Sequence, residues 1–376
     1  MISDLKILVT GGAGFIGSNL VDRLLEQNNR VVCLDNFATG KWENLEGAMK
    51  HPAFTLVEGD VRNYEDCHQA VKGCDYVLHH AALESVRRSI VDPMSSTDVN
   101  IGGFVKMLYA AREAGVKRFV YAAGSSAYGD HPVLPRVEHQ LGNALSPYGI
   151  TKYVDELFAK SFSEVYGIET IGLRYFNVFG QRQDPDGAYA AVVPLFVKQL
   201  IGHQSPVING DGSYSRDFIY IEDVIQANQL ALITPTEIIR ERQSKYFERF
   251  SHGQAGVASL KDGGGAVSAP VVTGSQPAAL SEVFNVAFGE STSLTRLAQL
   301  LKDKLARFDP DIAEVKLRYG PARADDVPHS LAGIEKGQTI LGYQPQYPVK
   351  KGLEEACRWY WQHFIKSNTG KMGKTH

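Results

Sequence analysis

The sequence contains few cysteines, and their spacing does not suit a metal site. Four occur in 376 residues, at Cys33, Cys67, Cys74 and Cys357. Structural zinc sites usually draw ligands from closely spaced cysteine pairs, and this pattern is missing here. We therefore expect no metal, and buried thiols in a reducing compartment.

Long apolar runs and an excess of one charge are also missing. No stretch approaches the ~18 apolar residues that a membrane helix needs, and the N-terminus enters a strand-like segment with no signal-peptide pattern. The net charge is -3, so the chain offers no basic footprint for nucleic acid or an anionic membrane. These absences predict a cytoplasmic protein that binds neither nucleic acid nor membrane.

The composition that remains is that of a globular protein, with 44% hydrophobic and 22% charged residues. Residues 1–175 alternate β-branched runs with helical patterns, which predicts an α/β fold with a doubly wound parallel sheet. The expected strands are Lys6 to Thr10, Arg30 to Leu34, Phe54 to Glu58, Tyr76 to His79, Arg118 to Ala122 and Glu169 to Arg174. The expected helices include Phe15 to Glu26 and Gly103 to Ala114.

Beyond residue 175 the alternation becomes irregular. We expect a smaller α/β substrate domain over residues 176–366, interleaved with the first because segments 221–233 and 283–287 could return to the first sheet. Residues 235–279 are rich in charge and then in Gly, Ser and Ala, which predicts a flexible insertion. Residues 367–376 form a polar tail.

A glycine-rich turn follows the first expected strand and opens the first expected helix. It runs Gly11-Gly12-Ala13-Gly14-Phe15-Ile16-Gly17, and this context predicts a Rossmann-type site where backbone amides approach a pyrophosphate. Asp35 ends the second strand, where a carboxylate can accept ribose hydroxyls and would repel a 2′-phosphate. The site therefore favours NAD over NADP. Asp60-Val61, after the third strand, could hold the adenine edge.

A tyrosine and a lysine lie four residues apart after a helix-start signal. Ser146 is a candidate N-cap and Pro147 a candidate first residue, so Tyr148 and Lys152 share one helix face. An ammonium beside a phenol favours the phenolate and makes it a general base. Taken alone, the pair also fits an ordinary solvated helix face.

These motifs occur together in one order, followed by further segments of the same kind. The further segments are His80-Ala81-Ala82, Ser125-Ser126-Ala127-Tyr128-Gly129, Arg174 to Gly180, Gln183 to Val192, Ile208 to Gly212, Arg323 to Val327 and Leu341-Gly342-Tyr343. The chain resembles the extended short-chain dehydrogenase/reductase family, the NAD-dependent epimerases and dehydratases. Within it, the chain is most similar to the bacterial UDP-N-acetylglucosamine 4-epimerases. The likeness covers nearly all of it except the insertion and the tail.

The resemblance implies a 4-epimerase that interconverts UDP-GlcNAc and UDP-GalNAc, with UDP-Glc and UDP-Gal as further candidates, through a transient 4-keto sugar. Tyr148 would be the base, and Lys152 would bind the nicotinamide ribose and lower the pKa of Tyr148. Ser125 is the first choice for an assisting hydroxyl and Ser126 the second. The implied NAD contacts are Gly11, Gly14, Phe15, Ile16, Gly17, Asp35, Asn36, Asp60, Val61, Ala81, Ala82, Asn100, Tyr148, Lys152 and Tyr175. The implied substrate contacts are Ser125, Ser126, Tyr148, Asn177, Val193, Ile208, Asn209, Arg216, Arg323 and Asp326.

Two positions depart from the family pattern. Gly124 stands where relatives commonly carry a serine or threonine, and Glu84 stands where those accepting N-acetyl sugars carry a small residue. Arg87-Arg88 keeps a UDP-glucuronate 4-epimerase, or another oxidoreductase of the family, as an alternative. A non-catalytic nucleotide-sugar-binding protein is a second one. Sugar-nucleotide dehydratases that resemble this family carry Asp-Glu where this chain has Ser125-Ser126, so the two carboxylates of a dehydratase are missing from this segment. The resemblance also implies a homodimer.

Overall fold

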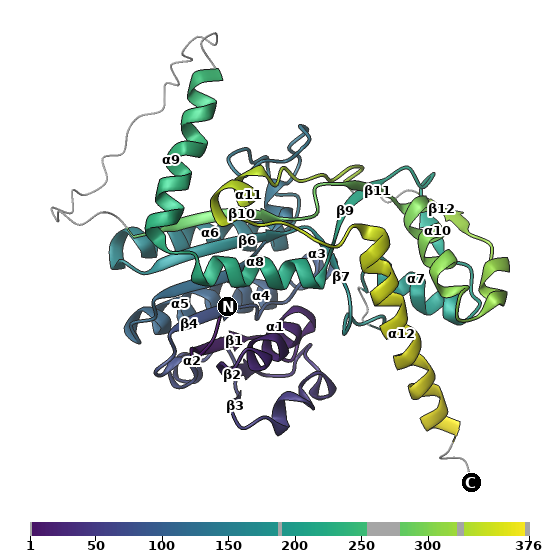
Figure 1. Cartoon of the computed structure of the whole chain (residues 1–376), viewed down its shortest axis with the longest axis horizontal. Helices are drawn as coiled ribbons and strands as arrows, with labels where there is room; N and C mark the ends of the chain where they lie inside the picture. The colour runs from purple at the N-terminus through teal and green to yellow at the C-terminus, as the bar shows by residue number, and fades with distance from the viewer. Residues whose placement is uncertain (1, 187–189, 254–278, 322–326, 373–376) are drawn as a thin grey trace.

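The computed structural model describes residues 2–186, 190–253, 279–321 and 327–372, with a seven-stranded parallel sheet at its centre (Figure 1). The strand order is β10-β6-β5-β4-β1-β2-β3, so the topology switches between β1 and β4, where such sheets bind ligands. The strands are β1 Lys6–Thr10, β2 Arg30–Asp35, β3 Phe54–Glu58, β4 Tyr76–His79, β5 Arg118–Gly124, β6 Glu169–Tyr175 and β10 Ser281–Val286. The predicted fold class is confirmed.

Helices cover both faces of this sheet because its strands are apolar on both sides. On β1, Ile7 and Val9 belong to a core with α1 and α8, whereas Leu8 points into a second core with α2, α5 and α6. This alternation follows from the two-residue period of a strand. These helices are α1 Phe15–Glu26, α2 Tyr64–Val71, α5 Phe104–Glu113, α6 Pro147–Tyr166 and α8 Ile221–Ile233.

The second part of the chain lies beyond β6 and forms two small sheets with their own helices (Figure 1). One sheet has the order β11-β9-β7 and the other pairs β12 with β8. The strands are β7 Asn177–Phe179, β8 Val207–Asn209, β9 Ser215–Tyr220, β11 Ser291–Ser293 and β12 Arg318–Gly320. Helices in the later part of the chain include α7 Val192–Ile201, α10 Leu294–Leu305, α11 Glu335–Leu341 and α12 Val349–Met372. The first part also has two short helices, α3 Val86–Val91 and α4 Pro93–Thr97.

Two later segments lie with the first sheet. Strand β10 pairs in parallel with β6, and α8 contributes Val224 and Leu232 to the core that contains β1 and β6 residues. The chain therefore crosses between its two parts more than once.

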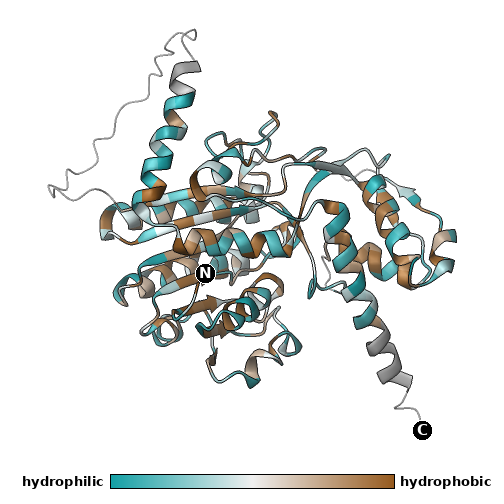
Figure 2. Cartoon of the chain, in the orientation of Figure 1, coloured by the Kyte–Doolittle hydropathy of each residue, from teal (hydrophilic) through white to brown (hydrophobic). Residues whose placement is uncertain are grey.

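The segment expected to be a flexible insertion begins with a helix, α9 Thr236–Gly253. Figure 2 shows it as largely hydrophilic, which explains why composition suggested a flexible segment. Its base is anchored, because Ile239 is fully buried in the main core and Arg242 donates to the carbonyl oxygen of Ile340 at 3.1 Å. Residues 254–278 lie outside the described part of the chain. Helix α12 likewise extends into the segment expected to be a polar tail.

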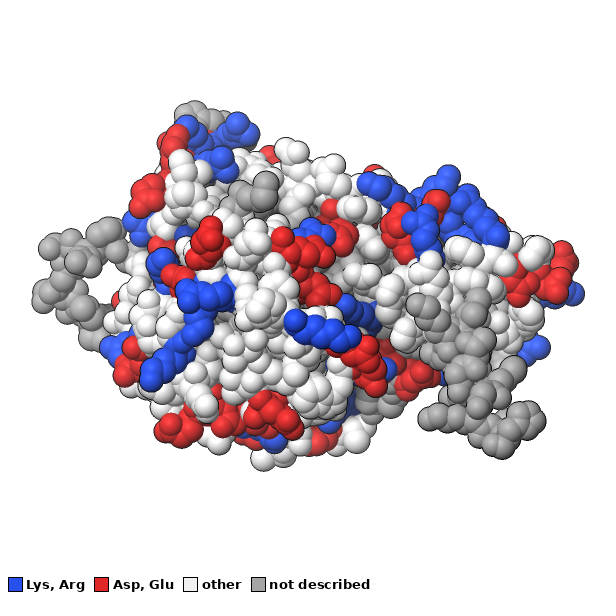
Figure 3. Space-filling view, turned by 60° about the horizontal axis from the view of Figure 1, so that its bottom comes forward, with Lys and Arg blue, Asp and Glu red and all other residues white. Residues whose placement is uncertain are grey.

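The surface carries both charge signs. Figure 3 shows acidic and basic side chains interspersed over most of the face in view. All four cysteines are unpaired and buried. Among the described residues, no helix is both long and apolar enough to cross a bilayer.

Candidate active site

The turn after β1 is packed closely against the chain that follows β4. Gly11 has a φ of +66°, and a side chain there would meet the backbone nitrogen of Ala81 at 2.7 Å. A side chain on Gly17 would overlap the carbonyl oxygen of Gly11. Both positions therefore require glycine. Helix α1 begins after Gly14 without a side-chain cap, so its first N–H groups suit an anion.

The carboxylate of Asp35 is fixed at the end of β2. It accepts hydrogen bonds from the backbone N–H groups of Ala13 at 2.9 Å and Phe37 at 2.8 Å. Burial raises the pKa of Asp35, and these backbone bonds oppose the rise. Asp60 accepts from Asn36 at 2.8 Å, and its hydrogen bonds with Arg62 lower its pKa to about 2. Two acidic strand ends thus lie beside the glycine turn.

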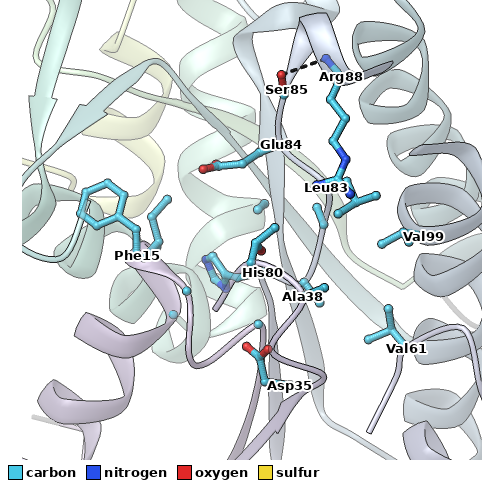
Figure 4. Close-up of a pocket in the computed structure, with 18 of the residues that line it drawn as sticks. Phe15, Asp35, Ala38, Val61, His80, Leu83, Glu84, Ser85, Arg88 and Val99 are labelled. Atoms are coloured by element: carbon cyan, nitrogen blue, oxygen red, sulfur yellow. Dashed lines mark hydrogen bonds between the residues drawn. The ribbon is translucent and has the colours of Figure 1, made fainter. Parts of the chain in front are cut away.

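A cavity of about 1030 Å³ opens at the carboxyl ends of these strands (Figure 4). It is lined by the predicted residues Gly11, Gly14, Phe15, Ile16, Gly17, Asp35, Asn36, Asp60, Val61, Ala81, Ala82, Tyr148, Lys152 and Tyr175. The structure thus brings most of the predicted cofactor residues to one site. Asn100 is the exception, since it does not line the cavity. Its buried side chain instead joins Leu83, at 2.8 and 3.2 Å, to Thr151 at 3.2 Å.

Helix α6 presents Tyr148 and Lys152 to this cavity. Its start is as predicted, with the Ser146 hydroxyl accepting from the N–H of Gly149 at 3.1 Å and Pro147 in the first turn. A second serine, Ser89, holds Tyr148 because its hydroxyl accepts from the backbone N–H of Tyr148 at 3.0 Å. The helix therefore holds Tyr148 and Lys152 on one face, one turn apart.

The surroundings of Tyr148 act on the pKa of its phenol. Burial raises its pKa above the usual value, and the negative charges of Glu84 and Asp155 add to the rise. The lowering of this pKa by Lys152 beside a bound NAD stays a prediction. In the structure the Lys152 ammonium lies 3.0 Å from the carbonyl oxygen of Ala122 and 3.5 Å from a carboxylate oxygen of Asp155.

The hydroxyl of Ser126 and the phenol of Tyr148 both lie close to Gly124. A side chain on Gly124 would start 3.2 Å from the Ser126 hydroxyl oxygen and 3.8 Å from the phenol oxygen of Tyr148. The hydroxyl oxygen of Ser126 is buried and has no hydrogen-bond partner among the described residues. Ser125 begins the 3-10 turn Ser125–Tyr128 and, as a residue, is half-buried like Ser126. These observations favour Ser126 as the assisting hydroxyl, and the order of the two serines stays a prediction.

Glu84 and His80 add two further titratable groups. Figure 4 shows Glu84 pointing into the cavity on the side of Phe15. The surrounding protein raises the pKa of the Glu84 carboxyl by removing water around it, and the positive charge of Lys152 opposes this rise. The side chain is still exposed at the cavity wall, so some water reaches it. Burial lowers the pKa of His80 to about 4, so His80 is neutral and bonds to the Tyr175 hydroxyl at 2.9 Å.

The predicted substrate residues of the second part lie outside the cavity lining. Asn177 donates to the carbonyl oxygen of Asp217 at 3.2 Å, and Arg216 donates to those of Ser215 at 2.9 Å and Pro328 at 3.1 Å. The side chains of two others, Val193 and Ile208, are packed in the hydrophobic core, so only their backbone could reach a ligand. Asn209 ends β8. Arg323 and Asp326 lie outside the described residues.

Some lining residues were missed by sequence reasoning. Lys41, after β2, forms an ion pair of 2.9 Å with Asp184, which follows β7, and both line the cavity. Ser85 contributes from the start of α3, next to Arg88, which the sequence had already singled out. No local pattern joins Lys41 to Asp184, because only the fold brings them together. Asp155 could have been found, since position i+3 from Lys152 lies on the same helix face.

Relatives cover almost the whole chain. A "Putative UDP-glucose 4-epimerase" of Methanocaldococcus jannaschii is 33% identical over 94% of this chain and 97% of its own. "UDP-glucuronate 4-epimerase 4" of Arabidopsis thaliana is 29% identical over 96% and 76%. A solved UDP-N-acetylglucosamine 4-epimerase from Methanobrevibacter ruminantium M1, in complex with UDP-N-acetylmuramic acid, is 32% identical with a TM-score of 0.80, over 96% of this chain and 100% of that one.

The family model that matches describes the "NAD dependent epimerase/dehydratase family". The match runs over residues 7–243, which contain the glycine turn, Asp35, Tyr148 and Lys152. These groups line the cavity at the carboxyl ends of β1 and β2 and on α6. This chain belongs to the NAD dependent epimerase/dehydratase family.

Proposed function

We propose that this protein is an NAD-dependent 4-epimerase of UDP-hexoses, and that UDP-GlcNAc and UDP-GalNAc are its preferred pair. The observation that carries the proposal is the position of Tyr148 and Lys152 in the wall of the cavity that also contains the glycine turn and Asp35. A base, an ammonium and an anion-binding turn converge there, as a redox-assisted inversion of a sugar alcohol requires.

The residues around the glycine turn fit NAD. Gly11 and Gly17 leave no room for side chains, so backbone amides at the start of α1 can approach a pyrophosphate. Asp35 would accept the adenosine ribose hydroxyls, and Asp60 and Val61 would flank the adenine. When bound, NAD supplies the oxidation and re-reduction of the sugar at C4.

Tyr148 would take the proton of the sugar 4-hydroxyl and return it after the 4-keto sugar has turned its other face. The Ser126 hydroxyl would donate a hydrogen bond to the same sugar oxygen, since both groups lie within 4 Å of one point beside Gly124. Its buried oxygen lacks a partner among the described residues, and such a group is costly unless a ligand satisfies it. Asn177, Arg216, Arg323 and Asp326 would bind the UDP portion, with the arginines on its phosphates.

Glu84 favours a neutral sugar over a uronate. A substrate carboxylate in its part of the cavity would face a like charge, which is unfavourable. The structure of the UDP-N-acetylglucosamine 4-epimerase from Methanobrevibacter ruminantium M1 contains UDP-N-acetylmuramic acid, and this supports the proposal of an N-acetyl sugar as substrate. Arg88 also lines the cavity, and for that reason UDP-glucuronate stays the second candidate. A Bacillus cereus UDP-glucuronic acid 4-epimerase is a structural neighbour at 27% identity, with a TM-score of 0.75.

The proposal is tested by incubating the purified protein with UDP-GlcNAc, UDP-Glc and UDP-GlcA in separate reactions, without added NAD, and resolving the products by NMR. We expect C4 inversion, fastest for UDP-GlcNAc. Faster turnover of UDP-GlcA would replace the substrate assignment. Binding of all three without any inverted product would contradict the enzyme proposal and favour a nucleotide-sugar-binding protein.

We also propose a homodimer formed through the outer faces of α5 and α6. Tyr109 on α5 and three residues of α6, Ile150, Tyr153 and Leu157, are large, apolar and exposed. The three α6 residues share one helix face, and exposed apolar side chains gathered in this way mark an interaction site. Light scattering should give twice the chain mass for the natural protein and a monomer for Leu157→Glu, whereas a natural monomer would contradict the proposal.

A further inference from the structure

The Lys152 ammonium is held from two sides. It donates to the carbonyl oxygen of Ala122 on β5 at 3.0 Å, and it lies 3.5 Å from Asp155 on its own helix. The side chains of both ion-pair partners are buried, with 6% and 1% of their surfaces exposed. Water therefore screens this pair little, and its charges act strongly on their neighbours.

Asp155 lacks the bonds of a purely structural carboxylate. One of its oxygens faces Lys152, and the other is buried with no hydrogen-bond partner among the described residues. A carboxylate held only by a long ion pair is expensive to ionise in such a place. Burial accordingly raises the pKa of Asp155 to about 7, although Lys152 pulls it down.

Other charged groups near this pair do not compensate Lys152 as directly. At the end of β4 and just after it, burial keeps His79 and His80 neutral by lowering the pKa of each. On α6, Glu156 is bound to Arg174. The charge of Glu84, in the loop after β4, couples to Lys152. The phenols of Tyr148 and of the buried Tyr121 on β5 couple to Asp155. Within the described chain, Asp155 is the one carboxylate that forms an ion pair with Lys152.

We propose that Asp155 is a positioning residue for Lys152, and that it sets how strongly the ammonium stabilises the Tyr148 phenolate. When Asp155 is ionised, it holds the ammonium and adds its own negative charge near the phenol. When Asp155 is neutral, the full charge of Lys152 acts on Tyr148. This inference rests on the proposed function only in taking Tyr148 as the catalytic base.

The test is Asp155→Asn, which removes the charge and keeps the shape. Asp155 and Tyr148 lie seven residues apart on α6, about 10 Å along a helix axis. Losing one unit charge at roughly that distance should lower the pKa of Tyr148 by about one unit at an effective dielectric constant of about 20. We therefore expect the acidic limb of kcat/KM against pH to move about one pH unit lower, and Asp155→Glu to restore it.

A matched control is available on α8. Asp223 is as buried as Asp155, with 1% exposed, but its oxygens accept from the backbone N–H groups of Gln346 at 2.6 Å and Tyr347 at 3.0 Å. Asp223→Asn should leave the acidic limb in place. If Asp155→Asn leaves it in place too, or if both variants move it equally, the proposal is overturned. A natural protein with no turnover would instead refute the proposed function.

A second readout does not require activity. A carboxyl whose pKa is raised on folding makes the folded protein less stable as the pH rises from the unfolded pKa, near 3.8, to the folded pKa of about 7. Asp155→Asn should therefore melt higher than the natural protein at about pH 8, and the difference should shrink as the pH falls toward about 3.8, the unfolded value. A variant that melts lower at both pH values, or does not fold, would overturn the proposal, because an amide closely replaces the neutral carboxyl.

Discussion

Helix α6 carries two buried carboxylates side by side, Asp155 and Glu156, and each faces a different cation. Glu156 holds Arg174 with two hydrogen bonds, at 2.8 and 2.7 Å, in the planar arrangement that fixes a guanidinium. Asp155 meets Lys152 at 3.5 Å and leaves one oxygen without a partner. The first pair is fully bonded and belongs to the framework. The second is loose, lies next to the cavity and can change its charge.

The largest effect should come from removing the phenol of Tyr148, on which the Lys152–Asp155 pair acts. Tyr148→Phe deletes the phenol without disturbing the helix, and we expect kcat to fall by about 10³-fold or more, within the usual contribution of a general base. Retained NAD absorbance and an unchanged melting temperature would verify the fold. Near-full activity in Tyr148→Phe would remove the base from the mechanism.

The tight pair should respond in stability instead. Glu156→Gln leaves the buried Arg174 guanidinium without its counter-charge, and breaking such a pair costs about 3 kcal/mol or more of unfolding free energy. Arg174 keeps a bond to the carbonyl oxygen of Glu138 at 3.0 Å and its contact with the Tyr128 ring. Urea unfolding measures the loss. If Glu156→Gln moved the acidic limb of kcat/KM as Asp155→Asn is expected to, the distinction between a structural pair and a pair that acts on Tyr148 would be wrong.

The two serines near Tyr148 give a smaller effect that distinguishes between neighbours. Ser126→Ala removes the hydroxyl beside the base, and we expect kcat to fall about tenfold to a hundredfold, the scale of one charge-stabilising hydrogen bond. Ser125→Ala is the matched control and should change kcat much less. The reverse ranking in steady-state assays would restore the order that the sequence suggested.

Glu84→Gln should have the smallest effect on the preferred sugar. It removes the like charge that a uronate would meet, so the ratio of kcat/KM for UDP-GlcA to that for UDP-GlcNAc should rise about tenfold, the scale of a modest charge contact. Competition assays with both sugars measure the ratio. An unchanged ratio would show that Glu84 does not select the sugar.

Sequence reasoning located the strands and the first helix because their patterns are local. The run Lys6 to Thr10 and the glycines after it have the period and turn chemistry of a strand-turn-helix unit, and the structure places both as predicted. Helix α6 was located by its cap at Ser146 and by Pro147. These features depend on neighbouring residues only.

Other features depended on contacts that no local pattern encodes. The composition of α9 suggested a flexible segment, but Ile239 anchors its base in the core. Asn100 was assigned to the cofactor, yet its amide is used by Leu83 and Thr151. Spacing shows that Lys152 is near Tyr148 but not that Asp155 engages Lys152.

The central claim is that Tyr148 and a bound NAD invert the sugar at C4 by removing and returning the same hydrogen. The direct measurement uses a UDP-hexose that the protein turns over, deuterated at C4, in ordinary water. We predict that the inverted product keeps its deuterium at C4, because the hydrogen leaves as a hydride and does not exchange with solvent. Loss of the label to water, or inversion at another carbon, would contradict the claim.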